Sequence, residues 1–161
     1  MALWGALFPG QGSQYPGMGL ELYQGSTAAR HVFEEADRAL GMPLTEIIFT
    51  GSAEDLLQTT VQQPAILTVS VAFWRAMQEK IGGDSRPSAA LGLSLGEYAA
   101  YVAAGALSFS AAVRLVQIRA RAMQEAVPSG QAGMLAVLKL ETEVVEEICR
   151  SVQSAGYIAP A

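Results

Sequence analysis

Ser94 stands between two glycines, where an apolar segment gives way to an alanine-rich one. The spacing Gly92-x-Ser94-x-Gly96 is that of a nucleophile elbow, in which a serine sits on a tight strand-to-helix turn with its hydroxyl exposed. Both glycines lack a Cβ, so the backbone can turn sharply and neighbouring segments can approach closely. A serine held in this way could attack a carbonyl carbon. Glycine and serine are common in turns, however, so the pentapeptide alone is a weak signal.

Arg119 is the second residue that could take part in binding or catalysis. Residues 109–126 are predicted to form a helix capped by Ser108. At about 100° per residue, Arg119 shares a face of that helix with apolar side chains: Ala112, Leu115, Val116, Ala122, Met123 and Ala126. An unpaired charge on a buried face is costly. We therefore expect a carboxylate partner for this guanidinium, either within the protein as a structural salt bridge or on a ligand held in bidentate fashion.

Two apolar runs are predicted to be the strands that position these residues. Ala2 to Phe8 has no polar face, which indicates a strand buried on both sides, and Ala89 to Leu93 leads into the elbow. A loop rich in glycine and proline, residues 9–17, follows the first run. Its Gly10-x-Gly12 lacks the third glycine of the dinucleotide fingerprint and the lysine of a P-loop. A structural or oxyanion-binding role is favoured over nucleotide binding.

Helices are expected between the two strands. Ser26 is a predicted N-cap for a helix that ends at Leu40, and a short helix is predicted at residues 43–49. Gln63-Pro64 is predicted to open a long helix over residues 65–81. Apolar residues recur along it at helical spacing: Ile66, Val69, Phe73 and Met77.

The region after residue 130 is predicted to be a new β-α-β unit. It comprises a strand at 134–140, an acid-rich amphipathic helix at 141–154 and a strand beginning at 157–159. The apolar face of that helix should point inward, with Val144, Val145, Ile148 and Val152. Strands that alternate with helices predict an α/β fold with a mostly parallel sheet.

Composition narrows the class of protein. The 161 residues are 51% hydrophobic and 16% charged, below the roughly 25% charged residues of soluble domains, which indicates extensive burial or a surface made to meet more protein. A net charge of −5 with no basic stripe argues against nucleic-acid binding. One cysteine and one histidine argue against an internal disulfide and an ordinary zinc site. We expect a soluble cytoplasmic protein without signal peptide, membrane segment or metal.

Five segments, in order and at the expected spacing, resemble one enzyme family. They are Phe8-Pro9-Gly10-Gln11-Gly12-Ser13-Gln14, Gln63-Pro64-Ala65, Gly92-Leu93-Ser94-Leu95-Gly96-Glu97-Tyr98, Val113-Arg114-Leu115-Val116-Gln117-Ile118-Arg119 and Met123-Gln124-Glu125-Ala126-Val127-Pro128. The family is that of malonyl-CoA:acyl-carrier-protein transacylase, whose pattern is shared by the acyltransferase domains of polyketide synthases. The resemblance runs from Leu7 to the last residue.

The resemblance implies a ping-pong acyl transfer in fatty acid biosynthesis. Ser94 would take malonyl from malonyl-CoA and pass it to the phosphopantetheine thiol of acyl carrier protein. The backbone N–H groups of Gln11 and Leu95 would form the oxyanion hole, and Arg119 would bind the malonyl carboxylate. Gln63 would be a further polar residue near the site. The resemblance implies no cofactor, since malonyl-CoA is the substrate. The expected partners are acyl carrier protein and CoA, and the enzyme is expected to be a monomer.

One element of the family pattern has no match. The family's general base is a histidine well downstream of the serine, whereas the only histidine here, His31, precedes Ser94. The family fold is a large α/β-hydrolase-like subdomain with a small ferredoxin-like subdomain. Residues 1–128 would be the first part of the former and residues 129–161 the beginning of the latter, truncated. We therefore expect an incomplete fragment that is inactive alone.

Three alternatives remain open from the sequence. The first is an acyltransferase of the polyketide synthase type. The second is an α/β-hydrolase such as a thioesterase, which would share the elbow and release free malonate; Arg119 and the Gln11 loop disfavour it. The third is a truncated, non-catalytic interaction module, which would take up no malonyl group.

Overall fold

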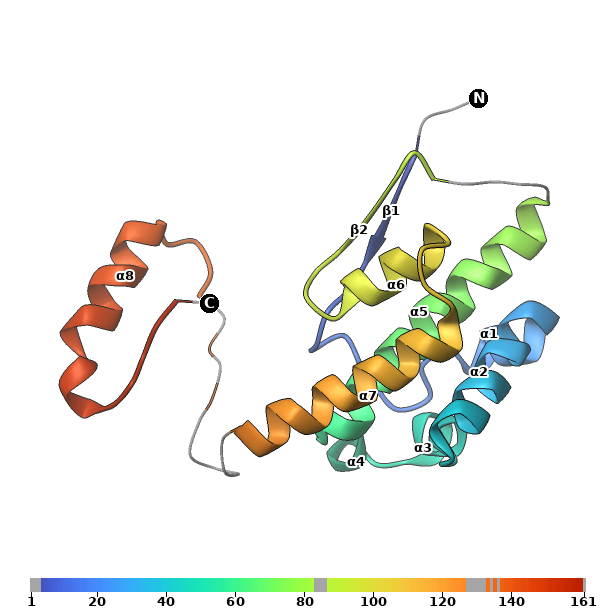
Figure 1. Cartoon of the computed structure of the whole chain (residues 1–161), viewed down its shortest axis with the longest axis horizontal. Helices are drawn as coiled ribbons and strands as arrows, with labels where there is room; N and C mark the ends of the chain where they lie inside the picture. Colours follow the sequence, from blue (N-terminus) through green and yellow to red (C-terminus); the bar gives the residue numbers. More distant parts are fainter. Residues whose placement is uncertain (1–3, 83–86, 127–132, 134, 136, 161) are drawn as a thin grey trace. The chain divides into compact units, whose positions relative to one another are not determined.

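The computed structural model describes residues 4–82, 87–126, 133, 135 and 137–160. The chain divides into two compact units, Met1–Val127 and Pro128–Ala161. We call them the first unit and the second unit, and describe each by itself. The first unit contains two parallel strands and a larger set of helices (Figure 1), so the predicted α/β class is confirmed at this level.

Helix α5 (Thr59–Ile81) is the centre of the first unit, where it packs against α2 (Thr27–Leu40) and α7 (Phe109–Ala126) (Figure 1). It begins six residues before the predicted start, so Pro64 lies inside the helix. The proline removes a single intrahelical hydrogen bond, the one to the carbonyl of Thr60. Every residue from 61 to 68 is buried, and this burial on all sides outweighs the lost bond. The predicted one-sided stripe is therefore wrong at Phe73, which is 60% exposed.

The local signals around α2 and α7 gave correct boundaries. The Ser26 hydroxyl accepts a hydrogen bond from the Ala29 N–H at 3.0 Å, and Gly41 ends α2 in the left-handed conformation at φ 65°. The Ser108 hydroxyl accepts from the Ala111 N–H at 3.3 Å at the start of α7. The remaining helices of this region are α1 (Leu20–Gly25), α3 (Leu44–Thr50) and α4 (Ala53–Leu57).

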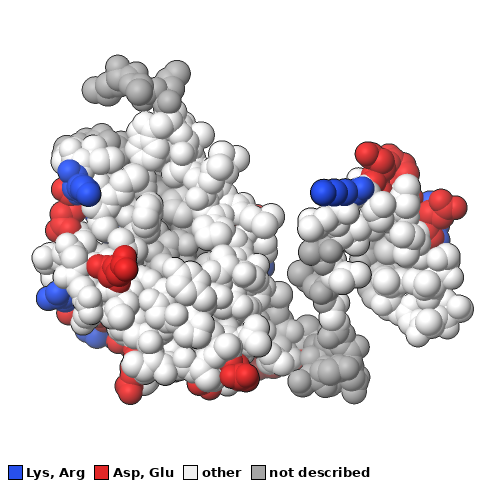
Figure 2. Space-filling view, turned by 180° about the vertical axis from the view of Figure 1, so that it is seen from behind, with Lys and Arg blue, Asp and Glu red and all other residues white. Residues whose placement is uncertain are grey.

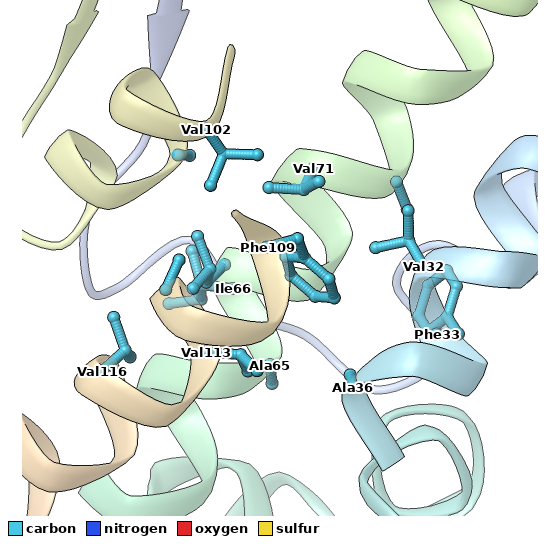
Figure 3. Packing of buried hydrophobic residues seen from close by; sticks show 14 of the residues in the cluster. Val32, Phe33, Ala36, Ala65, Ile66, Val71, Val102, Phe109, Val113 and Val116 are labelled. Carbon is cyan, nitrogen blue, oxygen red and sulfur yellow. The ribbon is translucent and has the colours of Figure 1, made fainter. Parts of the chain in front are cut away.

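The core of the first unit lies where α2, α5, α6 (Gly96–Ala103) and α7 meet. Figure 3 shows side chains from these four helices pointing toward one another, among them Val32, Phe33 and Ala36 of α2, Ala65, Ile66 and Val71 of α5, Val102 of α6, and Phe109, Val113 and Val116 of α7. All of these are buried. This core fixes α5 and α7 against each other, which matters below because each contributes a side chain to the candidate site.

Strands β1 (Gly5–Phe8) and β2 (Ala89–Gly92) pair in parallel, with Leu7 opposite Leu91 and Phe8 opposite Gly92. Helix α6 packs against both strands. The first strand was predicted to be buried on both sides, and this is wrong. Leu7 and Leu91 are paired on one face and are 78% and 58% exposed. Among the residues that the structure describes, nothing covers this face.

The second unit contains α8 (Thr142–Ser151) and a 3₁₀ turn (Gln153–Ala155). The predicted helix is confirmed, although it ends three residues early. Part of the predicted strand at 134–140 lies outside the described residues, and its described residues are not in a strand. Residues 157–159, also predicted as a strand, are not in one either. A strand needs a neighbour with which to exchange backbone hydrogen bonds, and none is present in the described part of this unit. The start of a ferredoxin-like subdomain is thus not confirmed.

The apolar face of α8 is largely uncovered. Val144, Ile148 and Val152 are exposed, Val145 is half-buried, and Cys149 is the buried residue of the helix. The prediction that the four aliphatic side chains point inward is therefore wrong for most of them. An amphipathic face is buried only when a surface is available to receive it.

Charged side chains are sparse on the molecular surface. On the face of the first unit seen in Figure 2, they lie toward one side and the lower edge, and a broad area carries none. Within the described residues, no helix combines the length and the apolar character needed to cross a bilayer.

Candidate active site

Ser94 lies in the turn that joins β2 to α6, as the glycine spacing predicted. It has a φ of 52°, in the left-handed region that a residue with a Cβ rarely adopts. Hydrogen bonds fix the turn on both sides: the Leu93 N–H donates to the Phe8 carbonyl at 3.2 Å, and the Gly96 N–H to the Leu93 carbonyl at 2.9 Å. The serine is exposed while the next residue, Leu95, is fully buried. The strained backbone therefore presents the hydroxyl outward at the start of a helix.

Glycines at three positions allow the backbone segments to meet. A Cβ on Gly96 would lie 2.8 Å from the Pro9 carbonyl oxygen and closer still to that of Phe8. A Cβ on Gly92 would overlap the backbone of Gly96. In the loop that follows β1, a Cβ on Gly10 would lie 2.8 Å from the carbonyl oxygen of Leu93 in the Ser94 turn. The loop after β1 is thus held directly against the Ser94 turn.

Gln11 belongs to this loop, and its side chain is tied to helix α5. Its Nε2 donates to Oε1 of Gln62 at 2.5 Å. The backbone N–H groups of Gln11 and Leu95 donate no hydrogen bond to any atom of the described residues. Leu95 immediately precedes α6, so its N–H lies at the N-terminus of a helix. The partial positive charge of that end favours the binding of a negatively charged oxygen. Both N–H groups predicted for an oxyanion hole are therefore available, next to the serine turn.

Arg119 reaches Ser94 from helix α7. Its Nη2 donates to the Ser94 hydroxyl at 2.8 Å, and its Nη1 donates to Oε1 of Gln63 at 2.6 Å. Gln63 is fully buried, and its Nε2 donates to the Met123 sulfur at 3.3 Å. The structure thus brings Ser94, Arg119 and Gln63 together. The alternative of a structural salt bridge is wrong for the described residues, because both partners of the guanidinium are uncharged.

The predicted position of Arg119 in an apolar stripe is correct only in part. Ala112 and Val116 are buried, but Leu115 and Met123 are more than a third exposed, and Arg119 itself is half-buried. The buried residues of α7 end at Ala120, after which every described residue of the helix is exposed. Arg119 therefore lies at the rim of the core rather than inside it, where a ligand can reach it.

The arrangement favours an acyl donor that carries a carboxylate. A guanidinium has five N–H donors and no acceptor, so the two contacts described leave donors for a ligand. No anion offsets its charge within the described residues, and a planar carboxylate beside Ser94 would match it. The site therefore combines a nucleophile, two free backbone donors and a fixed cation.

Two residues are brought to the site that the sequence analysis did not assign, Gln62 and Met123. Two adjacent glutamines inside an otherwise apolar helical stretch were the available signal for the first, whereas the partner of a methionine sulfur has no sequence signature. His31 lies on the exposed side of α2 and forms no hydrogen bond with any site residue named above. Within the described residues no histidine or carboxylate contacts the Ser94 hydroxyl.

Comparisons with known proteins identify the family of the chain. The family model of the acyl transferase domain matches residues 6–161. The chain is 46% identical over 152 residues to a malonyl CoA-acyl carrier protein transacylase of Bacillus subtilis, covering 94% of this chain and 47% of the relative. It is 39% identical over 160 residues to the protein of the same name from Escherichia coli, covering 99% and 51%.

Among solved structures, the chain is likewise similar to malonyl transacylases. An acyl-carrier-protein S-malonyltransferase from Burkholderia pseudomallei superposes with a TM-score of 0.88 at 42% identity, over 97% of this chain and 50% of the other. A malonyl-transacylase in complex with a type II polyketide synthase acyl-carrier protein superposes with a TM-score of 0.86 at 40% identity, over 95% and 49%. The chain spans about half the length of the curated relatives that it matches. On the strength of the family match over nearly its whole length, the chain belongs to the acyl transferase domain family.

Proposed function

We propose that this chain carries the nucleophile, the oxyanion donors and the carboxylate anchor of an acyl-carrier-protein S-malonyltransferase of fatty acid biosynthesis. The enzyme would transfer malonyl from malonyl-CoA to the phosphopantetheine thiol of acyl carrier protein. The observation that carries the proposal is the direct contact of Arg119 with Ser94. The names of the similar proteins support the same activity. On this proposal residues 1–128 belong to an α/β-hydrolase-like subdomain and residues 129–161 open a ferredoxin-like one.

The first half-reaction would begin with the free carboxylate of malonyl-CoA on Arg119. Ser94 Oγ would then attack the thioester carbonyl carbon, and the tetrahedral oxyanion would be stabilised by the N–H groups of Gln11 and Leu95. The C–S bond breaks, CoA leaves as the thiol after taking up the proton, and an O-malonyl serine remains. In the second half-reaction the carrier's thiol attacks this ester and restores the hydroxyl. The exchange is redox-neutral, and we propose that it uses no cofactor.

Removal of the proton from the Ser94 hydroxyl is the step for which the described residues supply no evident base. General-base catalysis contributes about 10²–10⁴-fold to such reactions, and the only histidine of the sequence, His31, is exposed on α2. We therefore expect the 161-residue chain to show no measurable acylation on its own, in line with the inactive fragment predicted from the missing histidine. Added imidazole should make acylation measurable, because the free base can take the proton that a catalytic histidine would take.

The test is covalent labelling of the 161-residue chain by malonyl-CoA, with and without imidazole. With imidazole present, intact-mass measurement should show one added malonyl group, and peptide mapping should place it on Ser94; without imidazole little or no malonyl group should be added. The matched control is Ser94→Ala, which should gain no malonyl group under either condition. Addition of holo acyl carrier protein should discharge the ester onto the carrier. Release of free malonate instead would indicate a thioesterase, and no Ser94 labelling with imidazole present would contradict the proposal.

Polyketide biosynthesis is the second candidate pathway. It is favoured by the structural similarity to a malonyl-transacylase in complex with a type II polyketide synthase carrier. The discharge step decides between the two. A carrier of fatty acid synthesis that accepts malonyl faster than a type II polyketide synthase carrier supports the first pathway, and the reverse order supports the second.

A further inference from the structure

We infer that Gln62 and Gln63 are two positioning residues with separate tasks, and this inference rests on the proposed function. Gln62 holds the Gln11 loop, which supplies one oxyanion donor, and Gln63 holds Arg119, which supplies the carboxylate anchor. Adjacent residues of one helix would thereby control two different properties of the site: the rate of acyl transfer and the selection of the acyl group.

Both glutamines are buried, and burial of a polar side chain destabilises a fold unless hydrogen bonds satisfy it. Gln62 is 7% exposed and Gln63 is fully buried, on the stretch of α5 that is enclosed on all sides. A buried amide without hydrogen-bond partners is destabilising. Each side chain directs its carbonyl oxygen to a single site residue: Gln62 to Nε2 of Gln11 at 2.5 Å, and Gln63 to Nη1 of Arg119 at 2.6 Å.

Met123 fixes which end of the Gln63 amide faces Arg119. The Gln63 Nε2 donates to the Met123 sulfur at 3.3 Å, which leaves Oε1 for the guanidinium. The reverse orientation would place two donors against each other, since a guanidinium cannot accept a hydrogen bond. Helices α5 and α7 are held together by the core, so Arg119 keeps a constant position relative to Gln63 while its Nη2 donates to the Ser94 hydroxyl.

The two contacts predict different kinetic signatures. The oxyanion forms whichever acyl group is transferred, so loss of the Gln62 contact should slow every acyl donor equally. A carboxylate is present on malonyl and absent from acetyl, so loss of the Gln63 contact should slow malonyl transfer specifically. A purely structural role would not separate the two donors in this way.

The experiment compares Gln62→Met and Gln63→Met in the 161-residue chain, because methionine preserves the length of the side chain and removes the amide. The rates of Ser94 labelling by malonyl-CoA and by acetyl-CoA are measured with imidazole present. Gln62→Met should slow both roughly tenfold and leave their ratio unchanged, whereas Gln63→Met should lower the malonyl-to-acetyl ratio roughly tenfold. The matched control is Thr68→Val, also on buried α5, whose hydroxyl donates to the Pro64 carbonyl at 2.8 Å and to no site residue; both of its rates should stay unchanged.

A double variant tests whether Gln62 acts through Gln11. Gln11→Met and Gln62→Met remove opposite ends of the same hydrogen bond, so the double variant should be no slower than either single variant. Multiplicative slowing would overturn the role of Gln62. An unchanged malonyl-to-acetyl ratio in Gln63→Met would overturn the role of Gln63.

A fluorophosphonate probe separates this inference from the proposed function. The probe carries no carboxylate, and its attack by Ser94 also develops charge on an oxygen in the oxyanion hole. Gln62→Met should therefore slow phosphonylation and Gln63→Met should not. This pattern in a chain that malonyl-CoA fails to label would overturn the malonyltransferase proposal and keep the assignment of Gln62. Equal phosphonylation rates in all variants would overturn that assignment.

Discussion

The helical core and the two-stranded sheet of the first unit are built in different ways. The core around α5 is closed by side chains, and Phe33 and Leu67 are almost completely buried in it. The sheet has two strands of four residues, and the side chains of Leu7 and Leu91 face outward from it. The sheet and the Ser94 turn depend instead on the contact of backbone with backbone, which Gly92 and Gly96 permit.

This difference separates the parts of the candidate site. The anchor, Arg119 bound to Gln63, is held by the closed core, whereas the nucleophile Ser94 lies in the turn that follows strand β2 of the open sheet. Burial of apolar side chains contributes about 25 cal/mol per Å² of surface removed from water, so the core should carry most of the stability of the unit. The sheet should contribute little stability and should be intolerant of added atoms at its glycines.

Truncation of one side chain in each region is the most direct test of this comparison. Phe33→Ala should lower the free energy of unfolding by about 3–5 kcal/mol, because it leaves a cavity in the core. Leu91→Ala should change it by less than about 0.5 kcal/mol, because the side chain is already exposed. Urea unfolding followed by circular dichroism measures both. Similar losses in the two variants would show that the sheet face is covered in solution.

Gly96→Ala should harm the sheet region through its backbone. The new Cβ would lie against the carbonyl oxygens of Phe8 and Pro9, and overpacking of this kind costs about 1–3 kcal/mol. Displacement of the turn should also abolish Ser94 labelling by a fluorophosphonate. Gly25→Ala is the matched control, since a Cβ there meets nothing within 4 Å. If Gly96→Ala retained normal labelling, the close approach of α6 to β1 would not be needed for the site.

Ser94→Gly should make the chain more stable than Ser94→Ala by about 1 kcal/mol, because a left-handed residue with a Cβ is strained. Both variants lose the hydroxyl and its hydrogen bond to Arg119, so the comparison isolates the backbone. Thermal unfolding of the two proteins measures the difference. An alanine variant at least as stable as the glycine variant would show that the φ of 52° stores no strain.

Much of this arrangement could be predicted from local sequence signals. Ser26 with Gly41, and Ser108, identified two helices because a cap acts on residues only three positions away. The spacing of Gly92, Ser94 and Gly96 identified the turn for the same reason. Arg119 was singled out because a charge among apolar neighbours needs a partner.

The remaining features depend on contacts between distant residues. The partners of Gln62 and Gln63 are 51 and 56 positions away, and no periodic pattern encodes such pairs. The start of α5 was missed because a helix buried on every side has no one-sided stripe, and Pro64 resembled its first residue. The predicted strands after residue 130 failed where they are described, since an apolar run becomes a strand only beside another strand.

The smallest predicted effect concerns how the stability of helix α4 depends on pH through the Asp55 carboxylate. At the start of α4, the backbone N–H and the hydroxyl of Ser52 both donate to the Asp55 carboxylate, at 3.0 and 2.9 Å. These bonds, the backbone one first, favour the charged form and hold the pKa of Asp55 below its usual value. A lowered folded-state pKa means that the contribution is present above the unfolded pKa and is lost as the pH falls through the folded pKa.

Asp55→Asn should therefore destabilise the chain slightly at pH 7 and progressively less as the pH falls below 4. The effect should be small because the carboxylate is exposed and solvated. Since α4 packs mainly on α5, the change should appear in core unfolding and leave the rate of Ser94 labelling at pH 7 unaltered. Urea unfolding at several pH values, with Glu54→Gln as the matched neighbour, measures it. A deficit in Asp55→Asn that stays constant down to pH 3 would mean that the carboxylate is not stabilised by its bonds to Ser52.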